Sequence, residues 1–108
     1  MSKPPDAATS KPAALRNCAP IFAALGDETR LRLIAVLCAG GAMSITQLTS
    51  GTQITRQAVT KHLLVLAQAG LVRDVKTGRE RLWQFELEKL EEARRSLDII
   101  VLVELARQ

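Results

Sequence analysis

Apolar residues recur at the three- and four-residue spacing of amphipathic helices along the first two thirds of the chain. A first helix is predicted from Pro12 to Leu25, with an apolar face made by Leu15, Cys18, Ala19, Phe22 and Leu25. Gly26 ends it, and Asp27 can cap a second helix whose apolar face would be Leu31, Ile34, Ala35 and Cys38. Gly40 and Gly41 are predicted to stop this helix.

Two shorter helical patterns follow. Ser44 and Gln47 form a capping-box pattern that predicts a short helix ending near Thr49, after which residues 50–52 are predicted to form a turn. Thr55 can cap a fourth helix that ends at Gly70. Its inward face would be Val59, Leu63, Leu66 and Ala69.

After Gly70 the apolar pattern changes to the alternation of β-strands. Residues 71–76 and 81–87 are predicted to pair as a hairpin around a turn at Thr77 and Gly78, with Trp83 and Phe85 on one face. A last helix is predicted from Glu88 to Gln108. Residues 1–11 are predicted to be a disordered tail, which leaves 12–108 as one domain, mainly α-helical with a small β-hairpin.

The last predicted helix is apolar around most of its circumference at its C-terminal end, where eight of the ten residues 97–106 are apolar. One small domain covers only one side of such a helix, and ten residues are too few to cross a bilayer. We therefore expect a homodimer joined through the first and last helices. The expected contact residues are Leu15, Phe22, Leu97, Ile100, Val101 and Leu105. The alternative is a core helix in a monomer.

Composition narrows the function. The chain has 108 residues, two cysteines and one histidine. Two cysteines are too few for a disulfide scaffold or for a zinc site made of thiolates alone, and a single histidine excludes any site that needs two imidazoles. No signal-peptide core or membrane-length apolar run is present, so we expect a cytoplasmic protein with no membrane partner. No nucleophile–base pair, phosphate loop or metal-ligand cluster is evident, so we expect neither an enzyme nor a cofactor.

The basic charge is concentrated in residues 55–83, which contain six basic and two acidic side chains. Two short helices, a tight turn and a basic hairpin are typical of a winged helix-turn-helix, whose second helix enters the major groove of double-stranded DNA. Arg56 could bind guanine and Gln57 adenine, each through two hydrogen bonds. The candidate DNA-binding residues are Thr55, Arg56, Gln57, Thr60, Lys61, His62, Lys76, Arg79 and Arg81.

Each of these assignments has a structural alternative. The helix residues could be the polar face of an ordinary amphipathic helix, and the hairpin charges could be a solvated tip. His62 could contact a phosphate or a base, or make a hydrogen bond at the edge of the core.

Three segments carry a resemblance to a known family. Residues 22–37 read FAALGDETRLRLIAVL, residues 45–72 read ITQLTSGTQITRQAVTKHLLVLAQAGLV, and residues 76–85 read KTGRERLWQF. Together they resemble the ArsR family of bacterial winged-helix repressors over roughly residues 14–108. The resemblance implies a homodimer that binds an inverted-repeat operator and represses its own or a neighbouring operon, with residues 55–69 as recognition helix.

Many members of that family release DNA when a metal binds, and here the chain departs from the pattern. The family's thiolate motif would fall near Ser44 and Thr46, which are not soft ligands, and residues 86–108 contain no histidine. The chain therefore resembles the branch that does not sense metals, and its effector is unknown.

Cys18 and Cys38 lie on the predicted apolar faces of their helices, which favours two small core residues. The alternative for the two cysteines is a thiol pair that senses oxidants and so controls DNA release.

The alternative for the whole domain is a winged-helix module that binds proteins instead of DNA.

Overall fold

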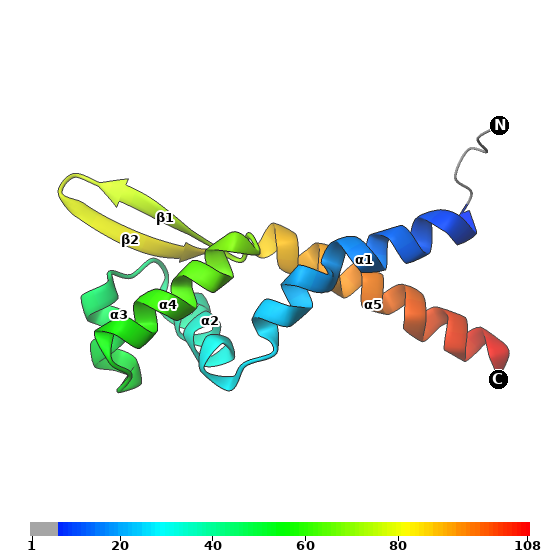
Figure 1. Ribbon diagram of the computed structural model, residues 1–108, viewed down its shortest axis with the longest axis horizontal. Coiled ribbons are helices and arrows are strands. Elements are labelled where there is room, and N and C mark those ends of the chain that lie inside the picture. The colour runs from blue at the N-terminus through cyan, green and yellow to red at the C-terminus, as the bar shows by residue number, and fades with distance from the viewer. Residues whose placement is uncertain (1–6) are drawn as a thin grey trace.

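The computed structural model describes the backbone of residues 7–108 and the side chains from residue 13 onward. Five helices and one antiparallel hairpin follow each other as α1 (Ala7–Leu25), α2 (Glu28–Gly40), α3 (Ile45–Thr52), α4 (Arg56–Gln68), β1 (Val72–Thr77), β2 (Glu80–Phe85) and α5 (Leu87–Arg107). In Figure 1, α2, α3 and α4 form the body beside the hairpin, while α1 and α5 pack together and extend away from it. This arrangement is the winged helix-turn-helix predicted from the sequence.

Side-chain caps set the starts of the central helices at the predicted residues. Asp27 accepts a hydrogen bond from the Arg30 backbone N–H at 3.0 Å. Ser44 and Gln47 exchange the two bonds of a capping box at 3.1 and 2.9 Å. Thr55 accepts from the Ala58 N–H at 3.2 Å. Each cap satisfies an N–H that has no partner within its own helix, and this fixes where α2, α3 and α4 begin.

The end of α4 is set by Gly70, which has a φ of +78°. The Gly70 N–H bonds to the Ala67 carbonyl at 3.0 Å, and the Leu71 N–H bonds to the Leu66 carbonyl at 2.9 Å. This is a Schellman motif, in which a left-handed residue closes the helix and the following apolar residue packs back against it. Leu71 is fully buried and leads the chain into β1.

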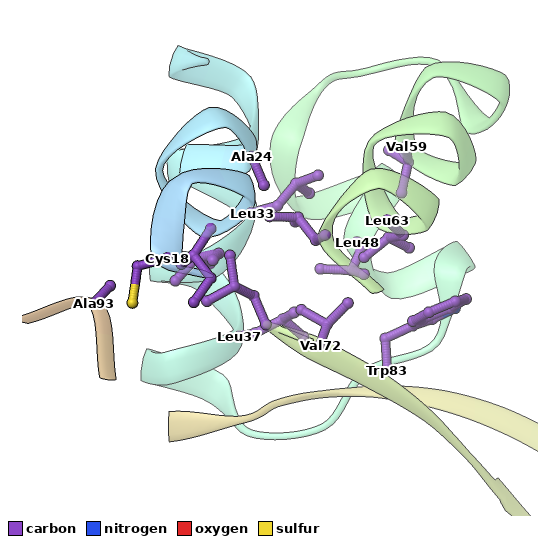
Figure 2. Packing of buried hydrophobic residues seen from close by; sticks show 14 residues of the cluster. Cys18, Ala24, Leu33, Leu37, Leu48, Val59, Leu63, Val72, Trp83 and Ala93 are labelled. Atoms are coloured by element: carbon purple, nitrogen blue, oxygen red, sulfur yellow. The ribbon is translucent and has the colours of Figure 1, made fainter. Parts of the chain in front are cut away.

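The core lies where α1, α2, α3, α4 and the base of the hairpin meet. Figure 2 shows Leu33 and Leu37 of α2, Leu48 of α3 and Leu63 of α4 converging on it. The inward residues predicted for α4 are confirmed, since Val59, Leu63 and Leu66 are buried and Ala69 is partly buried. Trp83 and Phe85 also lie on one face of the hairpin and join this core.

The predicted apolar face of α2 was correct for Ile34 and wrong for its other three residues. Leu31, Ala35 and Cys38 are exposed, and the buried residues are Leu33, Ile34 and Leu37. Residues 33–38 are all apolar, so two overlapping faces fit helical spacing, and only packing against α3 and α4 selects one of them. On α1 the predicted Ala19 is exposed and Ile21 and Ala24 are buried instead.

Two helix boundaries also differ from the predictions. Helix α1 begins at Ala7 instead of Pro12, so residues 7–11 of the predicted tail are helical, while residues 1–6 lie outside the described residues. Helix α3 continues through the predicted turn at 50–52. The Thr52 hydroxyl donates to the Leu48 carbonyl at 2.5 Å and is buried, and the reversal falls on Gln53 at a φ of +58°.

The hairpin pairs Val72 with Phe85 and Thr77 with Glu80, so its two-residue loop is Gly78 and Arg79. The predicted turn at Thr77 and Gly78 was therefore wrong by one residue. Gly78 has a φ of +62° and Arg79 has no positive φ, as in a type II′ turn that takes glycine first. The hairpin base is held by Met43, which exchanges backbone hydrogen bonds with Trp83 at 3.0 and 2.7 Å.

Helix α5 has two different halves. Its first half packs on α1, where Ala93 is buried near Cys18 (Figure 2), and Ser96 is buried about one turn further along α5. Its second half exposes the large apolar residues Leu97, Ile100, Val101, Leu102, Val103 and Leu105. Among the described residues, no helix has both the length and the apolar character that a membrane span requires.

Candidate nucleic-acid interface

The first two turns of α4 present polar side chains to solvent beside the α3–α4 turn. Thr55, Arg56, Gln57 and Lys61 are exposed, and Thr60 is partly exposed. The Thr60 hydroxyl donates to the Arg56 carbonyl at 2.9 Å. A shallow cleft of about 410 Å³ is lined by Arg56, Gln57, Thr60 and Lys61, so the structure brings these four predicted residues together.

A second, larger groove lies between the start of α3 and the hairpin. Its volume is about 850 Å³, and its lining includes Arg56, Lys76, Arg79 and Arg81. The structure therefore brings the predicted hairpin cations to the same groove as Arg56. Four cations and one acidic residue, Glu80, line this groove. Because positive charge exceeds negative charge there, the groove favours a polyanion.

Thr46 is part of this groove and was not predicted as a contact residue. It lies in the first turn of α3, and its hydroxyl accepts a hydrogen bond from the Arg56 guanidinium at 3.1 Å. This bond holds the Arg56 side chain over the groove. Arg56 therefore lines both the groove and the cleft on α4. No sequence signal marks Thr46, because the contact depends on how α3 and α4 cross.

The hairpin cations differ in their partners. Arg81 forms an ion pair with Asp74 at 3.2 Å across the hairpin, and both residues are exposed. Lys76 and Arg79 are exposed and have no ion pair within the described part of the chain. Trp83 lines the same groove with 6% of its surface exposed, and its indole N–H is buried without a hydrogen-bond partner among the described residues.

His62 lies on the side of α4 that faces α2 and is partly buried. Its Nδ1 is 3.3 Å from the Arg30 Nη1. The hydrogen bond considered as one of two roles for His62 is therefore present. Arg30 is a second residue that sequence reasoning missed, because its contact with His62 depends on how α2 and α4 pack.

The pKa of Asp27 lies below its ordinary value. The main cause is the hydrogen bond from the Arg30 backbone N–H, and the nearby positive charge of Arg30 adds to it. The Asp27 carboxylate is therefore charged at neutral pH and interacts favourably with the N-terminus of α2.

The residues predicted for a dimer contact fall into two groups. Leu97, Ile100, Val101 and Leu105 are exposed on α5. Leu15 is partly buried, and Phe22 is partly buried against the core of the chain.

The two cysteines have different environments. Cys18 is buried and Cys38 is exposed, and both are free thiols. The prediction that both are core residues is thus correct for Cys18 and wrong for Cys38. No group of three or more metal-ligating side chains occurs among the residues that the structure describes.

Comparison with known proteins places this geometry in a class. Residues 25–75 match the model of a helix-turn-helix domain. The chain is 40% identical over 76 residues to the HTH-type transcriptional regulator YuzN of Bacillus subtilis, covering 65% of this chain and 83% of YuzN. The fold and the exposed helix α4 therefore define a winged helix-turn-helix DNA-binding transcriptional regulator.

Solved structures narrow the class to a family. An ArsR-like transcriptional regulator from Rhodococcus sp. RHA1 is 35% identical, with a TM-score of 0.77 over 85% of this chain and 86% of that one. The homodimeric winged helix-turn-helix domain of Mb0332 from Mycobacterium bovis shares the fold at 23% identity, with a TM-score of 0.68 over 96% and 91% of the two chains. The chain belongs to the ArsR family of transcriptional regulators.

Proposed function

We propose that the protein is a homodimeric, sequence-specific repressor that binds an inverted-repeat operator in double-stranded DNA, in its own or a neighbouring operon. The observation that supports this most is the position of Arg56. It lines both the cleft on α4 and the groove beside the hairpin, so one duplex following both surfaces would meet a continuous row of donors.

The residues divide by the part of DNA that each would contact. Gln57 and Lys61 are exposed on the first turns of α4, where a recognition helix meets base edges in the major groove. The hairpin would contact phosphates or the minor groove beside the bases that α4 reads, through Lys76, Arg79 and Arg81. Arg56 is shared between both surfaces, and the N-terminal end of α4 adds a partial positive charge toward the backbone.

Dimerisation is the second part of the proposal. The exposed apolar residues of α5 form a hydrophobic surface whose contact with water is unfavourable. A second copy of the same helix would cover this surface. The domain from Mycobacterium bovis, which has the same fold, is homodimeric, and this supports a homodimer here. Two α4 helices would then enter successive major grooves about 10 to 11 base pairs apart, or a multiple of that.

We further propose that metals do not control this protein. Ser44 and Thr46 stand where the family has a thiolate motif, and Ser44 is engaged in the capping box of α3. The α5 segment has no histidine. We also propose that the protein acts in the cytoplasm, without a membrane partner or a cofactor.

The salt dependence of duplex binding tests the proposal. We expect the logarithm of the binding constant to fall linearly with the logarithm of salt concentration, with a slope of about −0.9 per phosphate contact. Arg79→Ala should make the slope less steep by about 0.9, the value for one phosphate contact. Arg32→Ala is the matched control, because Arg32 is an exposed arginine on α2 that pairs with Glu28 at 3.8 Å and lies outside both surfaces.

A flat salt response would contradict DNA binding and favour the protein-interaction module. Wild-type affinity in both Arg56→Ala and Lys61→Ala would contradict the assignment of α4 as the recognition helix.

The exposure of Cys38 favours one alternative mode of control, a thiol-responsive repressor. An oxidant in solution reaches an exposed thiol more readily than the buried Cys18. Mild oxidation should then release DNA from the parent protein and leave Cys38→Ser bound, with Cys18→Ser as the matched control. If a Cys18→Ser, Cys38→Ser double variant loses DNA as the parent does, thiol control is wrong.

A further inference from the structure

Arg30 connects three helices through one guanidinium group. From α2, its Nε donates to the Ala24 carbonyl at 2.6 Å and its Nη2 to the Ala23 carbonyl at 3.4 Å, both in the last turn of α1. Its Nη1 lies 3.3 Å from His62 Nδ1 on α4. The last carbonyls of a helix lack partners within the helix and favour a cation, so Arg30 completes the end of α1 while it reaches α4.

The contact with Arg30 determines which nitrogen of His62 carries the proton. A guanidinium group has five N–H donors, no acceptor, and remains protonated in proteins. Nδ1 must therefore accept, and the neutral imidazole carries its proton on Nε2. Among the described residues Nε2 makes no hydrogen bond, and it is not one of the buried polar atoms left without a partner, so its N–H is available to a ligand.

The location of this N–H suggests a ligand for it. His62 follows the exposed Lys61 on α4 and lies beside Arg30 near the N-terminus of α2. Asp27 is the acidic group at this position, and its carboxylate lies 3.9 Å from the Arg30 Nη1 and caps α2. Because the Arg30 guanidinium offsets the charge of the Asp27 carboxylate, an N–H donor beside this guanidinium suits an anionic oxygen of a passing phosphate.

We propose that Arg30 is a positioning residue for DNA binding: it holds His62 in the Nε2–H tautomer so that Nε2 donates to a phosphate oxygen beside the recognition helix. This inference rests on the proposed function. Because Arg30 also binds the end of α1, it connects the helix proposed for the dimer contact to the recognition helix.

The tautomer is measured directly, because His62 is the single histidine of the chain. A long-range ¹H–¹⁵N spectrum of the labelled full chain, recorded with the imidazole neutral, reports both ring nitrogens without overlap. We expect a protonated Nε2 and an unprotonated Nδ1 in the wild type, and a mixture of tautomers in Arg30→Met. Arg32→Met removes the same charge from the same helix and should leave the spectrum unchanged. A protonated Nδ1 in the neutral wild type would overturn the proposal.

Binding to a mixed-sequence 30-base-pair duplex tests the phosphate contact, since such a contact does not depend on sequence. In His62→Asn the side-chain amide oxygen occupies the place of Nδ1 and nothing replaces Nε2, so the bond to Arg30 is kept and the donor is lost. We expect about tenfold weaker binding for His62→Asn, which corresponds to one hydrogen bond to a charged group. Adding the wild-type protein to the duplex should also shift the Nε2 resonance.

The double variant separates positioning from plain stability. If Arg30 acts through His62, Arg30→Met should weaken binding in the wild type and add little in the His62→Asn background. Additive losses, or full affinity in His62→Asn, would overturn the proposal. Should Arg30→Met fail to fold, the wild-type tautomer and the His62→Asn affinity still decide it. If the wild type fails to bind any duplex, the proposed function itself is wrong, whatever the tautomer.

Discussion

Leu105 lies near the C-terminal end of α5 with 59% of its surface exposed, on the part of the helix where we propose that a second copy packs. Leu105→Asp tests this placement. Complete burial of a leucine side chain contributes about 1.5 to 3 kcal/mol, so covering the exposed share contributes about 1 to 2 kcal/mol per protomer. A two-fold interface uses the residue twice, which gives about 2 to 4 kcal/mol per dimer.

That free energy corresponds to a dimer dissociation constant about 30- to several-hundred-fold higher. The aspartate makes the loss larger, because its charge would be buried without a partner. Leu87→Asp is the matched control, since Leu87 is also a leucine on α5 with 59% of its surface exposed, but at the opposite end. The assay is sedimentation equilibrium over a series of protein concentrations.

We expect the wild type and Leu87→Asp to dimerise alike and Leu105→Asp to be mainly monomeric at micromolar concentration. An Ile100→Asp, Leu105→Asp double variant should also bind DNA more weakly, although α4 is unchanged. If Leu105→Asp dimerises with wild-type affinity, the proposed interface is wrong.

Three further predictions follow from the caps and the recognition helix. Thr55→Ala should lower the free energy of unfolding by about 1 kcal/mol in chemical denaturation, because the Ala58 N–H loses its cap; an unchanged value would contradict the cap. The lowered pKa of Asp27 makes it stabilising above its ordinary titration near pH 4, and that contribution is lost as pH falls through its folded pKa. Asp27→Asn, which keeps an equally good cap, should therefore lose less stability between pH 5 and pH 2 than the wild type, and equal losses would contradict this. Gln57→Ala should reduce discrimination among duplex sequences while leaving the salt slope unchanged, and a reduced slope would assign Gln57 to phosphate instead.

The fold could be predicted from sequence where the signal is local. Asp27, Ser44 and Thr55 act as caps within three residues of their own position, so their hydrogen bonds depend little on the rest of the molecule. Val59, Leu63 and Leu66 follow helical spacing after the Thr55 cap, and those residues are buried, whereas the neighbouring Leu64 and Val65 are exposed.

Prediction failed where tertiary packing decides between local solutions. Leu31 and Cys38 fit helical spacing as well as Leu33 and Leu37 do, and only the crossing of α2 with its neighbours leaves them exposed. The residues 50–52 read as a turn, yet burial of Thr52 and its bond to Leu48 keep them helical.

The same distinction holds for the candidate site. The exposed residues at the start of α4 could be predicted from periodicity, because the buried face of that helix fixes the opposite one. Thr46 and Arg30 could not, since their contacts with Arg56 and His62 join helices whose relative placement the sequence pattern does not encode.

Selection of duplexes from a random pool by the purified wild-type chain, followed by sequencing, tests the central claim most directly. We predict enrichment of an inverted repeat whose half-sites are centred about 10 to 11 base pairs apart, or a multiple of that. A pool without an enriched sequence, or one enriched in a single half-site without two-fold symmetry, would contradict the proposal that two copies of α4 bind DNA together.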